Sequence, residues 1–138
     1  AKVILCSHMG KPKGQVVESL SLAPVAKSLS EKLGKNVVFA DDDNVVGENA
    51  KAAVAAMNDG DVVLLQNTRY FDLDNKKESN CDEELSKYFA SLGDIFINDA
   101  FGLIHRYHAS NVGISKLLPS GIGFLMEKEL NHWFFQQM

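Results

Sequence analysis

The stretch DVVLLQNTR at residues 61–69 decides the fold that the sequence predicts. Its apolar run at 62–65 is continuous rather than alternating, and the turn signal NDG at 58–60 precedes it. A strand that is apolar on both faces is typical of a parallel sheet covered by helices on both sides. We therefore predict a buried parallel strand over residues 61–66, with polar residues leaving its carboxyl end.

Three further apolar runs repeat this pattern, and helical patterns alternate with them. Ser21 is placed to cap the first helix and Gly34 to end it. Alternating strands and helices predict an α/β fold, doubly wound, with a mainly parallel sheet and helices on both faces. The other strands are expected at residues 2–6, 36–40 and 94–98, and the helices at 22–33, 48–57, 82–92 and 123–137.

Composition narrows the class of protein. The chain has 138 residues, 46% of them hydrophobic and 23% charged, which is ordinary for one globular domain. A net charge of -4 argues against a general nucleic-acid binder, and no apolar run is long enough to span a membrane. Cys6 and Cys81 have neither metal-ligand spacing nor the density of a disulfide framework, so we predict a cytoplasmic protein.

Basic residues follow the predicted strands. The 14 cations divide into 12 lysines and two arginines, Arg69 and Arg106. Both arginines lie in the polar segments 7–12, 67–70 and 99–108 that leave three of the strands, as do His8, His105 and His108. Because ligands of parallel sheets bind beyond the carboxyl ends of the strands, we expect these side chains to share one sheet edge. The sequence thus predicts a basic pocket on an acidic protein.

Such a pocket suits a small anion such as a phosphorylated metabolite. Arg69 and Arg106 can each donate two parallel hydrogen bonds, and Lys11 adds a point charge. We expect His8 and His105 to donate further hydrogen bonds. Gly10 and Gly102 would let the backbone approach the ligand. Taken singly, each segment could be an ordinary turn or solvated loop, and only their combination favours a site.

Other candidate sites are weaker. The acidic run Asp41-Asp42-Asp43 lacks the alternation and the glycine of a calcium loop, so we interpret it as a solvated turn. Neither a phosphate-binding loop of the GxxxxGK[ST] type nor a GxGxxG fingerprint occurs in the sequence. We therefore predict no metal site and no cofactor site in this chain.

Six ordered motifs resemble those of the phosphoglycerate kinase family. They are SHMGKP at 7–12, SLAPVA at 21–26, GDVVLLQNTR at 60–69, NDAFG at 98–102, HRYHAS at 105–110 and GFLMEKEL at 123–130. The resemblance implies a Rossmann-like N-terminal domain that binds 3-phosphoglycerate or 1,3-bisphosphoglycerate. It places substrate-binding roles on His8, Met9, Gly10, Lys11, Arg69 and Arg106, with charge stabilisation by Arg106. Supporting roles fall on Asn67, Gly102 and His105.

The resemblance also implies parts that this sequence does not contain. The family's first strand is expected before Ala1, and a C-terminal domain that binds Mg-ATP is expected after Met138. Residues 1–138 are then a single, incomplete N-terminal domain of a two-domain cytoplasmic kinase of glycolysis, inactive alone. Lys11 stands where the family usually has arginine, Gln66 where it has glutamate, and Leu103-Ile104 where it has a small pair.

Two alternatives stay open on the residues. The chain could be a non-catalytic binding module for a phosphorylated small anion. It could also be a different α/β enzyme that shares only an anion pocket, although six motifs in the family's order count against that alternative.

Overall fold

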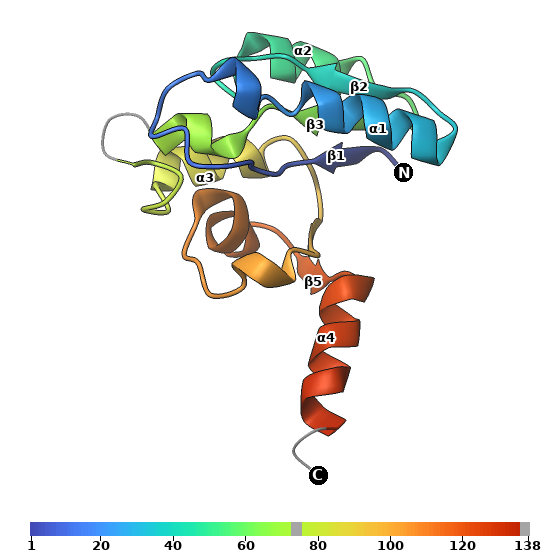
Figure 1. Ribbon diagram of the computed structural model, residues 1–138, viewed down its shortest axis with the longest axis vertical. Helices are drawn as coiled ribbons and strands as arrows, with labels where there is room; N and C mark the ends of the chain where they lie inside the picture. The colour runs from blue at the N-terminus through green and yellow to red at the C-terminus, as the bar shows by residue number, and fades with distance from the viewer. Residues whose placement is uncertain (73–75, 136–138) are drawn as a thin grey trace.

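Strands and helices alternate along the chain in the computed structural model, which describes residues 1–72 and 76–135 (Figure 1). The expected helix end at 136–137 lies outside the described residues. In chain order the elements are β1 (Val3–Leu5), α1 (Ala23–Leu33), β2 (Val37–Ala40), α2 (Glu48–Ala55), β3 (Val62–Leu65), α3 (Glu83–Ala90), β4 (Phe96–Asn98), β5 (Ser120–Ile122) and α4 (Phe124–Phe135).

Strand β3 forms the centre of a parallel three-stranded sheet in the order β1-β3-β2. All four of its residues are buried, as its unbroken apolar run predicts. Val62 and Leu64 belong to the core beneath α1, whereas Val63 and Leu65 belong to the core shared by α2 and α3. Helix α1 therefore covers one face of this sheet, and α2 and α3 cover the other. The predicted α/β fold with helices on both faces is confirmed.

The expected single sheet edge is wrong. Strand β4 pairs with β5 in a separate parallel sheet, with Ile97 opposite Gly121. Hydrophobic runs identify strands but do not encode which strands become neighbours. The sequence analysis also missed β5, because Ser120-Gly121-Ile122 contains only one residue that favours strands. The loops after β1 and β3 therefore leave one sheet, and the loop after β4 leaves another.

One of two turns differs from its expected chemistry. Asp42 is 6% exposed, and its carboxylate accepts hydrogen bonds from the backbone N–H groups of Asn44 (2.9 Å) and Ala50 (3.1 Å). It therefore satisfies an N–H group in the first turn of α2, and the interpretation as a solvated turn is wrong for this residue. Gly34 ends α1 in a left-handed conformation (φ 62°), as predicted.

The start of α1 depends on a residue distant in sequence. Ser21 accepts a hydrogen bond from the N–H of Ala23 (3.3 Å), but the N–H of Leu22 donates to the buried Gln66 side chain (3.1 Å). The residue after β3 thus fixes the beginning of the helix after β1. Among the described residues, no helix is long and apolar enough to cross a bilayer.

Candidate anion-binding site

The loop after β1 is shaped by Asn67, which follows β3. Asn67 is fully buried, and its side-chain amide donates to the carbonyls of Met9 (2.8 Å) and Leu20 (2.9 Å). Gly10 has a φ of 66°, and a Cβ there would lie 2.7 Å from a Leu20 methyl carbon. The predicted glycine requirement therefore comes from this turn and from packing. Asn67 holds the loop in place, as a supporting residue should.

The remaining side chains of this loop divide by environment. Lys11 is exposed and free to approach an anion. Met9 instead packs against the apolar cluster under α1, so only its backbone faces the loop's polar surroundings. His8 is half-buried and lies with its ring centroid 6.3 Å from that of His108.

Arg69 lies on a short 3-10 helix, Thr68–Asp72, directly after β3. Its Nε donates to Asp72 (3.0 Å), and a terminal nitrogen donates to the carbonyl of Gly10 (3.3 Å). Its backbone N–H donates to Asn67 Oδ1 (3.1 Å). Arg69 is therefore in part a structural clamp between two loops, with donors left over on its terminal nitrogens.

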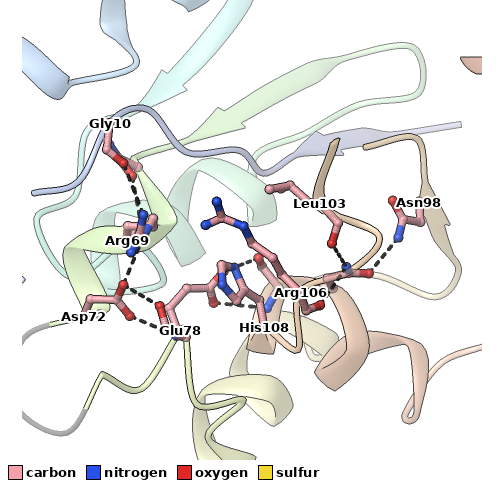
Figure 2. A network of polar contacts seen from close by, with 12 residues as sticks. Gly10, Arg69, Asp72, Glu78, Asn98, Leu103, Arg106 and His108 are labelled. Carbon is pink, nitrogen blue, oxygen red and sulfur yellow. Dashed lines mark hydrogen bonds and ion pairs between the residues drawn. The ribbon is translucent and has the colours of Figure 1, made fainter. Parts of the chain in front are cut away.

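Arg106 reaches the same place from the second sheet. It lies after the 3-10 helix Phe101–Leu103, and Asn111 donates to the carbonyls of Leu103 (3.3 Å) and Arg106 (3.4 Å). Figure 2 shows its side chain extended toward Arg69. Within residues 1–72 and 76–135, no acidic side chain forms an ion pair with Arg106. Its guanidinium is available to a ligand.

Burial and the two arginines together lower the pKa of both neighbouring histidines. Burial, followed by the charges of Arg69 and Arg106, lowers the pKa of His8. Burial, Arg106 and Arg69 do the same to the pKa of His108. At neutral pH both imidazoles are therefore uncharged, each with one donor and one acceptor nitrogen. The positive charge of the site comes from the arginines and Lys11.

His108, rather than the predicted His105, faces the site. His108 is 6% exposed and lies against His8, whereas His105 and Gly102 are exposed in the loop after β4. The run HRYH at 105–108 brings both histidines to the same loop. The residue after His108, Ala109, is also buried.

Glu78, which no sequence pattern singled out, lies beside His108 (Figure 2). Glu78 is fully buried, with Oε1 3.6 Å from His108 Nδ1. It accepts hydrogen bonds from the N–H (3.1 Å) and hydroxyl of Ser110. Burial raises its pKa to about 7 despite these bonds. A lone glutamate in the polar stretch 67–80 gave no sequence signal that it would be buried.

The arrangement is an open, donor-rich surface rather than a closed cavity. A hollow of about 340 Å³ is lined by Val46, Lys51, Phe71, Leu85 and Tyr88, among others, but by neither arginine and neither histidine. No group of three metal-ligating side chains occurs in the part of the chain that the structure describes. The donors and positive charges of the site are suited to hydrogen bonding and charge neutralisation of an anion.

Comparisons with known proteins agree with this description. The family model described as "Phosphoglycerate kinase" matches residues 1–134. The phosphoglycerate kinase of Clostridium perfringens is 66% identical over 131 residues, which are 94% of this chain and 32% of that protein. That of Clostridium kluyveri is 63% identical over the same length.

Solved structures give the same result. A phosphoglycerate kinase from Pyrococcus horikoshii matches with a TM-score of 0.78 and 32% identity, over 95% of this chain and 32% of that one. One from Coxiella burnetii matches with a TM-score of 0.73 and 33% identity, over 94% and 31%. The chain thus spans about a third of the length of these relatives. Because the family match covers nearly all of it, the chain belongs to the phosphoglycerate kinase family.

Proposed function

We propose that the arginine cluster binds 3-phosphoglycerate or 1,3-bisphosphoglycerate. The observation that carries this proposal is the approach of Arg106, which has no acidic partner among the described residues, to Arg69 from a different sheet. Two guanidinium forks match phosphate and carboxylate oxygens, and each charge-assisted hydrogen bond contributes about 1.5–3 kcal/mol. Family membership supports this choice of anion over others of similar charge.

The proposed roles follow from placement. Arg69, Arg106 and Lys11 neutralise the anion, while His8 and the backbone at Met9 and Gly10 complete its surroundings. Asn67 supports the loop, and His105 and Gly102 lie at the exposed margin. During phosphoryl transfer Arg106 would stabilise the charge that develops on the transferred group.

We further propose that the parent protein is a cytoplasmic glycolytic kinase. In it, residues 1–138 form a single, incomplete N-terminal domain, and a C-terminal nucleotide-binding domain holds Mg-ATP outside this chain. Mg-ATP supplies the phosphoryl group, and the magnesium ion neutralises its charge. The chain alone should then bind phosphoglycerate but not phosphorylate it. The alternative, a non-catalytic binding module, differs only in what the gene encodes beyond Met138.

Isothermal titration calorimetry of the purified chain tests the binding proposal. We expect 3-phosphoglycerate to bind weakly, and less well at high salt, since charges at an open surface are screened. Glycerate, which lacks the phosphate, is the matched control and should bind less well. Binding that is equal for the two ligands, or absent, would contradict the proposal.

A coupled assay with ATP tests the proposed inactivity of the isolated chain. We expect no turnover of 3-phosphoglycerate. Turnover by the 138-residue chain would show that the nucleotide site lies within it. Sequencing the parent gene beyond the codon for Met138 separates the kinase from the stand-alone module.

A further inference from the structure

We infer that the adjacent residues Glu78 and Ser79 are positioning residues that set the placement of both arginines of the anion-binding site. The inference rests on the proposed function only for what the arginines bind. Neither residue needs to touch the ligand. Each acts through one arginine-bearing segment.

Ser79 fixes the Arg69 side. Its backbone N–H donates to Asp72 Oδ1 (2.9 Å), and its hydroxyl donates to Asp72 Oδ2 (2.7 Å). Oδ2 also accepts from Arg69 Nε (3.0 Å). Asp72 is thus held at both oxygens, and the orientation of its carboxylate sets that of the guanidinium. The side chains of Arg69 and Asp72 are only 16% and 6% exposed, so water competes little for the hydrogen bond between them.

Glu78 fixes the Arg106 side. Its carboxylate accepts from the N–H (3.1 Å) and hydroxyl of Ser110, and its carbonyl accepts from the N–H of Ala109 (2.9 Å). It also lies 3.6 Å from His108. These contacts hold residues 108–110, which begin two residues after Arg106. Because Glu78 is fully buried, its anchoring bonds are shielded from water.

Glu78 and Ser79 are consecutive residues, so their contacts link two segments that the hydrogen bonds of the sheets do not connect. Arg69 follows the three-stranded sheet and Arg106 follows the separate β4–β5 sheet. Packing of residues 109–113 on α3 holds that segment as a whole, with Gly113 close against Ser86. The hydrogen bonds of Glu78 act at the other end of this segment, the end nearer to Arg106. One dipeptide therefore contacts both arginine-bearing segments, through Asp72 on one side and through residues 108–110 on the other.

NMR of the arginine side chains tests the inference, because the chain contains only Arg69 and Arg106. With ¹⁵N-arginine labelling, Ser79→Ala should shift mainly the Arg69 Nε signal, and Glu78→Ala mainly that of Arg106. We expect 3-phosphoglycerate to bind about three- to tenfold more weakly in each variant, the equivalent of one misplaced hydrogen bond. Glu78→Gln keeps an acceptor for Ser110 and should restore the affinity to within about twofold.

Two controls separate positioning from general damage. Ser91→Ala removes an exposed hydroxyl on the carbonyl of Tyr88 and should change neither signal. Met57→Ala destabilises the core without removing a hydrogen bond of the network. The inference is overturned if the Ser79→Ala and Glu78→Ala variants retain wild-type signals and affinity, or if Met57→Ala weakens binding equally. If the wild-type chain does not respond to 3-phosphoglycerate, the proposed function fails. The arginine signals of the ligand-free variants then decide whether Glu78 and Ser79 are positioning residues.

Discussion

Arg69 and Asp72 form an ion pair with 3.0 Å between Nε and Oδ2, in which both side chains are largely buried. Arg106 has no such pair among the described residues. The two arginines that the sequence presents as equivalent therefore differ in role. Arg69 is bound by its own protein, whereas the guanidinium of Arg106 would be left for the proposed ligand.

Alanine substitutions should separate these roles. Arg106→Ala should weaken 3-phosphoglycerate binding by about 1.5–3 kcal/mol with little change in the free energy of unfolding. Arg69→Ala should weaken binding and also lower the free energy of unfolding, because it removes the hydrogen bonds from Arg69 to Asp72 and to the carbonyl of Gly10. Calorimetry and urea denaturation measure the two effects. Lys27→Ala, on the exposed surface of α1, is the control and should change neither. Equal destabilisation by both arginine variants would refute the distinction.

The histidines report on the arginine charges. Burial, then Arg69 and Arg106, lowers the pKa of His8, and the same causes act on His108. In NMR titrations both rings should therefore protonate below the ordinary value of about 6.5. Arg106→Ala should raise both pKa values, since a neighbouring cation is removed, although burial keeps them low. Addition of 3-phosphoglycerate to the wild-type chain should raise them too. Histidine titrations that do not respond to Arg106→Ala would show that the guanidinium lies elsewhere.

Glu78 should make stability depend on pH. Burial raises its folded-state pKa to about 7, whereas an unfolded glutamate titrates near 4.3. Between these values the folded chain retains a proton that the unfolded chain has lost, so the contribution of Glu78 to stability falls as pH rises and levels off above pH 7. Relative to wild type, Glu78→Gln should therefore gain up to about 3 kcal/mol from pH 4 to pH 8. Urea denaturation across this range measures the difference, and a difference that is constant with pH contradicts the assignment.

Gly10 offers a test of the loop. Gly10→Ala combines left-handed strain with a Cβ placed 2.7 Å from Leu20. Gly34→Ala, at a φ of 62° with no atom within 4 Å of the added carbon, carries the strain alone and is the matched control. We expect Gly34→Ala to cost about 1–2 kcal/mol and Gly10→Ala to cost more. Only Gly10→Ala should also weaken anion binding, because the carbonyl of Gly10 contacts Arg69. Equal costs at the two positions would mean that Leu20 moves aside freely.

Sequence patterns predicted the local structure well and the long-range contacts less well. The apolar run at 62–65 predicted β3, and Gly34 predicted the end of α1, because burial and backbone conformation act locally. The strand-end rule selected both arginines, which do converge, although they leave two sheets rather than one. Polar residues whose roles depend on distant partners were invisible. Glu78 is buried only because residues 108–110 fold over it, and Asp42 only because α2 begins beside it.

The separation into two sheets gives the site a dynamic consequence. Every residue of β3 is buried, whereas β5 is exposed along its whole length and β4 at its centre. Segments with so little protection open locally while the rest of a protein stays folded. Opening of β4 and β5 would carry Arg106 away from Arg69 without disturbing the three-stranded sheet. The affinity for the proposed anion would then include the free energy of keeping that part closed. A bound ligand should in turn slow amide hydrogen exchange in β4 and β5 more than in β3.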